Sequence, residues 1–229
     1  MNASERTSAA LAQADLLVAC VRAFGGEVDQ ADDLRAERTR LFEIPGVCPP
    51  YEAAWVRRDK GAILGDISGF YRAFGFQGAD ANGVRPDHLA AQLEFLAVLR
   101  VMEAQALQRG ALEAADITRE AYVNFLLEHI SEWIAPFCAR LKSCTALGEL
   151  HECCDLIETM WNAEAASNHV PPFDQLGSDT EPEPFDANGG TPYECLAPDV
   201  DECDGAPRDG FVQLTTSGVG GARRAGEHA

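Results

Sequence analysis

Apolar residues recur every three or four positions through most of the first 169 residues, which is the periodicity of amphipathic helices. The clearest helical segment covers residues 86–108, and the proline at its start suits the first turn of a helix. Its apolar positions are Leu89, Leu93, Leu96, Val101, Ala104 and Leu107. At about 1.5 Å per residue this helix would be roughly 34 Å long. We expect Leu93, Phe95 and Leu96 to lie in the core.

Shorter helical segments precede it. A first helix is predicted to end near Gly25, because paired glycines stop a helix readily. Its buried face is expected to consist of Leu11, Ala14, Leu17, Val18 and Val21. A second helix is predicted over residues 32–43, and prolines interrupt the pattern after it. One or two helical turns within residues 51–60 and a compact aromatic segment, residues 66–74, closed by Gly75, complete this part.

Two further helices are predicted after the long one. One begins near Thr118 and continues toward Trp133, and Pro136 is expected to kink or restart it. The last covers residues 147–165. Its apolar stripe is Leu150, Cys153, Cys154, Ile157 and Trp161. No segment alternates apolar and polar residues over four or more repeats, so the predicted fold class is all-α, a single helical-bundle domain.

The composition changes near residue 169. Residues 170–229 carry 12 acids and only three bases, together with seven of the 12 prolines. Such a segment buries too little apolar surface to offset its backbone entropy. We therefore expect a helical domain over residues 1–169 and a mostly disordered acidic tail over residues 170–229.

The net charge of −19 excludes a phosphate-binding surface, which needs clustered lysine and arginine. Nucleic acids and anionic membranes are excluded for this reason, and the expected partners are basic or apolar.

The N-terminal residues lack the basic and long apolar regions of a signal peptide, and no stretch of about 18 uninterrupted apolar residues suggests a membrane span. The eight cysteines do not form a disulfide framework. We expect a cytoplasmic protein with reduced thiols.

The sequence lacks the motifs of common catalytic sites: a Gly-x-Ser-x-Gly elbow, a phosphate-binding loop and a His-Glu-x-x-His zinc motif. Glu94 and Glu103 could act as acid and base, but exposed helix charges are far commoner. The prediction is a protein that is not an enzyme.

A metal site is the weaker alternative. His151, Cys153 and Cys154 cluster on one predicted helix, with further cysteines on either side in the sequence. However, the Cys-x-x-Cys spacing of zinc and iron–sulfur sites is missing, and adjacent helical residues point about 100° apart. Buried free cysteine is favoured, so no metal and no cofactor is predicted.

Four strings of residues carry more specific information. Residues 85–96 read RPDHLAAQLEFL. The negative charge of Asp87 would interact favourably with the positive end of the helix dipole. Residues 49–55 read PPYEAAW, residues 70–76 read FYRAFGF, and residues 128–133 read EHISEW. These strings, in the order in which they occur along the chain, resemble the motifs of the TorD/DmsD/NarJ-type chaperones, which mature molybdoenzymes. The resemblance covers about residues 40–141 and is greatest to the branch similar to nitrate reductase delta subunits.

The resemblance implies a helical chaperone that binds the apo catalytic subunit of a molybdoenzyme of the dimethyl sulfoxide reductase or nitrate reductase type. Members of the family often bind the N-terminal region or twin-arginine signal of that subunit, assist molybdenum cofactor insertion and delay export. An acidic surface would attract such a basic signal. The residues that match the motifs, and that we expect to bind the partner, are Asp87, His88 and Glu94, followed by Glu52, Tyr71 and Glu128. His88 is expected to titrate in the physiological range.

Two other functions stay open at this point. One is a protein that delivers a metal or an iron–sulfur cluster through His151, Cys153 and Cys154. The other is a permanent structural subunit of an oxidoreductase. The client, the peptide-binding groove, guanine nucleotide binding and the choice between monomer and dimer are left open.

Overall fold

The computed structural model describes residues 2–25, 32–43, 46–77, 84–168, 170–176 and 181–182, and within these ranges it is helical with no strand. The helices are α1 (Ala3–Gly25), α2 (Asp32–Phe42), α3 (Glu52–Trp55), α4 (Lys60–Ala73), α6 (Leu89–Gln108), α7 (Leu112–Phe125), α8 (Ile134–Cys144) and α9 (Gly148–Asn168). A π-helical turn, η1 (Leu126–Ile130), follows α7, and a 3-10 turn, η2 (Phe173–Gln175), follows α9. The predicted all-α fold class is confirmed.

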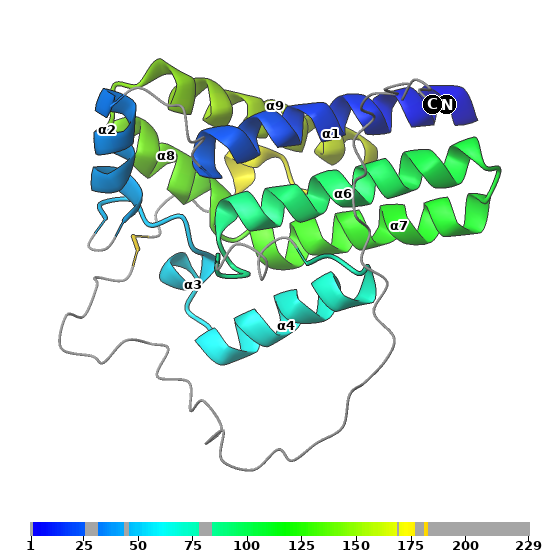
Figure 1. The fold of residues 1–229 in the computed structure, drawn as a ribbon, viewed down its shortest axis with the longest axis horizontal. Coiled ribbons are helices and arrows are strands. Elements are labelled where there is room, and N and C mark those ends of the chain that lie inside the picture. Colours follow the sequence, from blue (N-terminus) through cyan, green and yellow to red (C-terminus); the bar gives the residue numbers. More distant parts are fainter. Residues whose placement is uncertain are drawn as a thin grey trace, which may run out of the picture. The chain divides into compact units, whose positions relative to one another are not determined.

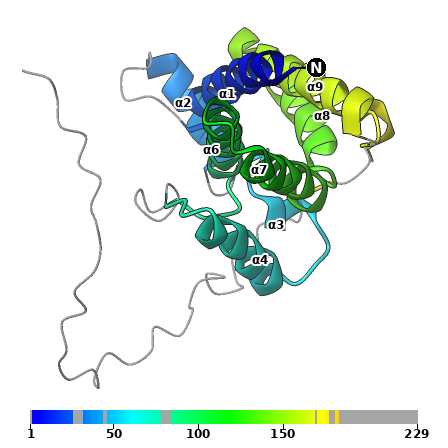
Figure 2. The ribbon, with the colours of Figure 1, turned by 90° about the vertical axis from the view of Figure 1, so that its right-hand side faces the viewer.

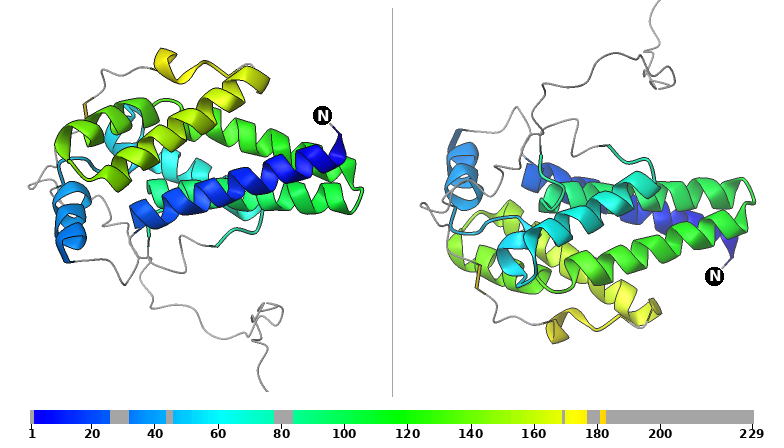
Figure 3. Two further views of the ribbon diagram at one scale, coloured as in Figure 1. Left: turned by 90° about the horizontal axis from the view of Figure 1, so that it is seen from above. Right: turned by 90° about the horizontal axis from the view of Figure 1, so that it is seen from below.

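The long helices α1, α6 and α7 run alongside one another, and α4 lies on the other side of α6 and α7 from α1 (Figures 1 and 2). Helix α9 packs on α1 and on α8, as the views from above and below also show (Figure 3). Helix α6 is therefore enclosed by other helices, and most of its residues are buried. Leu93, Phe95 and Leu96 lie in the core as predicted.

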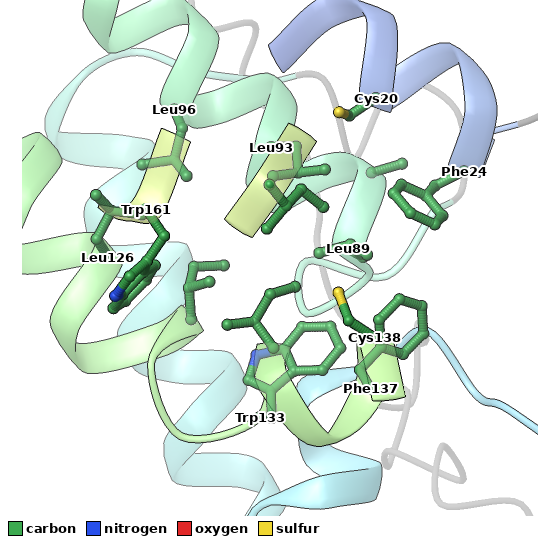
Figure 4. Close-up of a cluster of buried hydrophobic side chains, with 14 of the residues drawn as sticks. Cys20, Phe24, Leu89, Leu93, Leu96, Leu126, Trp133, Phe137, Cys138 and Trp161 are labelled. Carbon is green, nitrogen blue, oxygen red and sulfur yellow. The ribbon is translucent and has the colours of Figure 1, made fainter. Parts of the chain in front are cut away.

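The core is formed mainly by aliphatic and aromatic side chains of α1, α6, η1, α8 and α9 (Figure 4). Leu89, Leu93 and Leu96 of α6 extend into it, and Trp133 and Phe137 pack edge to face at 5.5 Å between ring centroids. Burying a large apolar side chain contributes about 1.5–3 kcal/mol. The apolar positions predicted for the long helix, such as Leu89, Leu93 and Leu96, are thus core positions that stabilise the bundle.

The buried face of α1 differs from the predicted one. Leu17 is buried as expected, but Leu11 and Val18 are each 39% exposed, while Cys20 and Phe24 are buried instead. Residues 10, 14, 17, 20 and 24 follow the helical spacing of three and four more closely than the predicted set. Apolar residues on both sides of α1 made its buried side ambiguous from the sequence.

Helix α1 is also long and apolar enough to cross a membrane by length and composition alone, and it is the one such helix in the described part of the chain. Helix α1 carries Asp15 and Arg22, so it does not contain an uninterrupted apolar stretch of about 18 residues. A helix in the core of a bundle can meet the same criteria, and α1 packs along α6.

Several element boundaries differ from the predicted ones for local reasons. Helix α6 begins at Leu89 because His88 caps it, and α7 begins six residues before Thr118, directly after the turn at Gly110. Gly110 has φ +72, a conformation that glycine adopts most readily. Helix α8 restarts at Ile134, so Pro136 stands in its first turn, where its missing N–H costs nothing.

The packed part of the chain continues beyond residue 169. Val170 and Phe173 are buried against the core, and the indole Nε1 of Trp161 donates a hydrogen bond of 2.8 Å to the Pro171 carbonyl oxygen. Residues 1–185 form one compact unit, and the second unit, residues 186–229, lies outside the described residues. The predicted disorder of the tail stays a prediction.

A group of buried and half-buried charged side chains links α6, α7 and α9. Arg100 pairs with Glu103 within α6, and Arg119 of α7 pairs with Glu164 of α9. Both guanidinium groups also lie 5.1 Å from the ring centroid of Tyr122. Each buried charge therefore has a partner, which is what burial of charge requires.

Candidate functional site

Two of the four strings meet at the start of α6. Tyr51 and His88 form an antiparallel bridge, in which the Glu52 N–H donates to the Asp87 carbonyl oxygen at 3.0 Å. The Leu89 N–H donates to the Pro50 carbonyl oxygen at 2.8 Å. The segment before α3 is thus fixed to the segment before α6.

Asp87 makes the side-chain contribution to this junction. Its carboxylate is fully buried, accepts a hydrogen bond from the Ala53 N–H at 3.2 Å, and pairs with the Arg85 guanidinium at 2.8 Å. The same guanidinium lies 4.5 Å from the ring centroid of Tyr51. Burial raises the pKa of Asp87, and Arg85 opposes that shift. Asp87 therefore holds the start of α3 against the start of α6.

Glu52 is the second buried carboxylate, and it joins three further elements. It accepts from Gln92 Nε2 of α6 at 2.7 Å, and it lies 3.3 Å from His129 Nδ1 of η1 and 3.2 Å from an Arg58 guanidinium nitrogen. Burial raises the pKa of Glu52, and His129 gives the largest opposing contribution. The strings at residues 49–55 and 128–133 thus meet at this side chain.

Tyr71 of α4 brings in the remaining string. Its hydroxyl donates to the Pro86 carbonyl oxygen at 2.8 Å, and its ring packs against Phe76 and Phe95 at 4.8 Å between centroids. Burial raises the pKa of Tyr71, so the side chain is a neutral donor. Strings that lie far apart in the sequence therefore form one polar junction, which we call the motif junction: Glu52, Arg58, Tyr71, Arg85, Asp87, His88, Gln92 and His129.

His88 is half-buried and serves as the N-cap of α6. Its Nδ1 accepts a hydrogen bond from the Ala90 N–H at 3.1 Å, a bond that needs an unprotonated nitrogen. Burial, with Arg38 and Arg85 nearby, lowers the pKa of His88 to about 4. The expectation that His88 titrates in the physiological range is wrong, because the ring is desolvated and next to cationic groups.

Glu94 and Glu128 are the two predicted residues nearer the surface. Glu94 is half-buried on α6, and the Glu128 side chain is exposed on η1. In this π turn the Ser131 N–H donates to the Leu126 carbonyl oxygen, five residues back, at 2.9 Å. The carbonyl oxygens of Glu128 and His129 accept from the side chains of Arg58 and Trp133 instead. Side chains of Arg58 and Trp133 thus fix the backbone of the turn that carries Glu128.

The sequence reasoning did not single out Arg58, Asp66, Gln92 or His129. His129 and Gln92 lie inside the strings, so the signal was present, but their burial depends on contacts 77 and 40 residues away from them at Glu52. Asp66, on α4, lies 3.6 Å from His129 Nε2 through its carboxylate oxygen Oδ2. Nothing in its sequence surroundings indicated that contact.

The alternative metal site on α9 is not assembled. His151 Nε2 lies 2.8 Å from the Thr145 carbonyl oxygen, and the buried Cys20 contacts Cys153. In the described ranges, Asp66, Glu128 and His129 are the one group of three potential metal ligands whose ligand atoms converge. The described cysteines are free thiols, as expected. His151, Cys153 and Cys154 therefore give no support to a delivery protein.

Comparison with known proteins gives the same family as the strings. Residues 4–139 match the family described as the nitrate reductase delta subunit. The selenate reductase assembly chaperone protein of Thauera selenatis is 35% identical over 143 residues, 56% of this chain and 72% of that protein. The chlorate reductase assembly chaperone protein of Ideonella dechloratans is 34% identical over 125 residues, 52% of this chain and 64% of that protein. No solved structure matches the chain.

The helical fold and these relatives define the class of protein, an assembly chaperone rather than an enzyme. The chain belongs to the nitrate reductase delta subunit family.

Proposed function

We propose that the chain is a cytoplasmic maturation chaperone for the apo catalytic subunit of a molybdoenzyme of the dimethyl sulfoxide reductase or nitrate reductase type. It binds the N-terminal or twin-arginine signal region of that subunit, assists molybdenum cofactor insertion and delays export. The assembly chaperones of selenate and chlorate reductases among its relatives support this proposal.

The observation that carries the proposal is the motif junction together with the acidic surface beside it. The side chains of Asp66 and Glu132 are 59% and 54% exposed. The Glu128 side chain is also exposed, and its carboxylate lies near that of Asp66. Arg58 lies 3.8 Å from Glu132 at this surface. A twin-arginine signal is basic and then apolar, so a locally acidic surface attracts its first part.

The predicted partner-binding residues divide into two groups under this proposal. Glu52, Tyr71 and Asp87 are buried and act as positioning residues, because they fix α3, α4 and the start of α6 relative to one another. Glu94 and Glu128 are accessible enough to contact the client directly. His88 caps α6 and is also a positioning residue.

The first experiment is an anaerobic pull-down of the tagged full-length chain from its own host, with mass spectrometry of the proteins recovered. We expect a catalytic subunit that lacks its molybdenum cofactor. Recovery of the complete, cofactor-loaded enzyme at fixed stoichiometry would make the chain a permanent structural subunit. Recovery of neither would contradict the proposed function.

A binding experiment tests the residues. Fluorescence anisotropy with a labelled peptide of the recovered client's N-terminal region should show at least tenfold weaker binding for Glu94→Lys and Glu128→Lys, because each replaces an attractive charge by a repulsive one. Glu120→Lys is the matched control, since Glu120 is an exposed acid on α7 outside the motif junction. Equal loss in all three variants would mean that net charge alone governs binding.

A further inference from the structure

His129 has an unusual environment for a buried histidine. The side chain is buried, and Nε2 has no hydrogen-bond partner in the described part of the chain. This nitrogen is directed at the Asp66 carboxylate, 3.6 Å away, and the Glu128 carboxylate is close to both. A buried polar atom without a hydrogen bond is unfavourable, and this one faces two carboxylates.

The separations suit a metal ion. The three ligand atoms, one each from Asp66, Glu128 and His129, all lie within 4.8 Å of one another. Bonds of about 2.0–2.1 Å in tetrahedral geometry place neighbouring ligand atoms roughly 3.4 Å apart. The distance of 3.6 Å between His129 Nε2 and the Asp66 oxygen is close to that value. The exposed carboxylates need only small side-chain rotations to complete the set.

The other ring nitrogen has the partner that a metal-binding histidine usually has. His129 Nδ1 lies 3.3 Å from the buried Glu52 carboxylate, which can accept a hydrogen bond from Nδ1–H and so favour the tautomer with a free lone pair on Nε2. The rings of Phe70 and Phe125 contact the imidazole with centroids 5.6 and 4.9 Å away. Glu52 and these two rings therefore hold His129 with Nε2 facing Asp66 and Glu128.

The charges around this position are mostly negative. Glu52 of α3, Asp66 of α4 and Glu128 of η1 surround His129, whereas Arg58 lies 3.2 Å from Glu52 and donates to the Glu128 carbonyl oxygen at 3.1 Å. A divalent cation at Nε2 would offset part of this negative charge, and the nearby Glu132 would keep its own. Protonation of Nε2 is the competing way to satisfy the same groups, and the experiment must separate the two.

We propose that Asp66, Glu128 and His129 bind a divalent transition-metal cation, with an imidazole and two carboxylates as protein ligands and water completing the coordination. This mixed nitrogen and oxygen set suits Zn²⁺ and other divalent cations of the first transition series. Bound metal would join α4 to the π turn beside the motif junction. The site is distinct from the cysteines and His151 of α9.

The test uses the purified full chain, treated with chelator and dialysed, and titrated with Zn²⁺ by calorimetry and with Co²⁺ by visible absorption. We expect saturable binding of one equivalent in the micromolar range. The Co²⁺ spectrum should show ligand-field bands of a nitrogen and oxygen site, without the near-ultraviolet charge-transfer band of a thiolate. That band would assign the metal to cysteines and overturn the proposal.

Two variants and a control locate the metal. Asp66→Asn and Glu128→Gln should each weaken Zn²⁺ binding at least tenfold, whereas Glu120→Gln, an exposed acid elsewhere, should leave it unchanged. Because Asp66 and Glu128 are exposed, both variants are expected to fold, and circular dichroism checks this. Wild-type affinity in either variant would overturn the proposal.

Nitrogen NMR of the imidazole decides between metal and proton. If both ring nitrogens of His129 are protonated at pH 7.5 and unchanged by one equivalent of Zn²⁺, the site is an ion-paired imidazolium and the proposal is wrong. These measurements need no client protein, so their failure is separate from failure of the chaperone function.

Discussion

Replacement of His88 by asparagine should make the free energy of unfolding less dependent on pH. His88 has a pKa lowered to about 4 in the folded chain, against an ordinary value of 6.5. Between these values the unfolded chain binds a proton that the folded chain does not. Stability from this group is therefore complete above pH 6.5 and is lost as the pH falls toward 4.

The magnitude follows from the size of the pKa shift. Each pKa unit corresponds to about 1.4 kcal/mol, so the shift allows at most about 3 kcal/mol between pH 6.5 and pH 4. Partial exposure of the ring reduces this figure, and we expect a loss of about 2 kcal/mol. Asparagine is an equally good N-cap and does not titrate, so His88→Asn keeps the hydrogen bond to Ala90 and removes the pH dependence.

Urea unfolding followed by circular dichroism, repeated at half-unit steps from pH 4.5 to 7.5, measures the effect. The relevant quantity is the difference between wild type and His88→Asn at each pH, because the buried carboxylates Glu52 and Asp87 titrate in both proteins. His88→Ala is the second variant. It should lose the pH dependence to the same extent and, in addition, about 1 kcal/mol at pH 7.5 through loss of the cap.

A wild-type stability that stays parallel to that of His88→Asn over the whole pH range would refute this reasoning. Such a result would mean that His88 is solvated and titrates equally in folded and unfolded chains. Equal stability of His88→Ala and His88→Asn at pH 7.5 would show that the Nδ1 hydrogen bond contributes nothing.

Three further predictions concern stability and are checked by urea unfolding. Leu93→Ala should cost about 2–5 kcal/mol because it opens a cavity in the core, whereas Leu112→Ala, 54% exposed, should change stability by less than about 0.5 kcal/mol. Gly75→Ala should destabilise by about 1–2 kcal/mol, since Gly75 has φ +66, while Gly65→Ala, within α4 and with open space beside it, should stabilise by up to about 1 kcal/mol; effects of the same sign would contradict the assigned backbone conformations. Glu52→Ala should cost about 3–5 kcal/mol, because it leaves buried donors without an acceptor, and a loss below 1 kcal/mol would mean that the motif junction does not depend on this carboxylate.

The helical fold was predictable because helices depend on local spacing. Apolar residues at intervals of three and four located α2, α6 and α9 to within a few residues of their observed ends. The start of α6 was misplaced by three residues, because Pro86 suits a first helical turn while His88, the actual cap, gave a weaker signal. The buried face of α1 was misjudged since apolar side chains occur on both of its sides.

The candidate site was predictable only in part. The strings identified Glu52, Tyr71, Asp87 and His88, and these residues do lie together, but as buried or half-buried groups that position helices. Their expected part in partner binding stays a prediction. The metal alternative shows the opposite case, since Cys153 and Cys154 are neighbours in sequence and yet form no common ligand set.

The sequence by itself determined the helical class, the positions of the main helices and the strings that place the chain in its family, because each of these is written in short-range spacing. The tertiary structure alone decided which polar side chains meet. Glu52 and His129 are 77 residues apart in the chain, and they meet because Glu52 also bonds Gln92 of α6 while the His129 ring packs against Phe70 of α4. Burial at that meeting point then sets the charge and accessibility of each group, which no local pattern encodes.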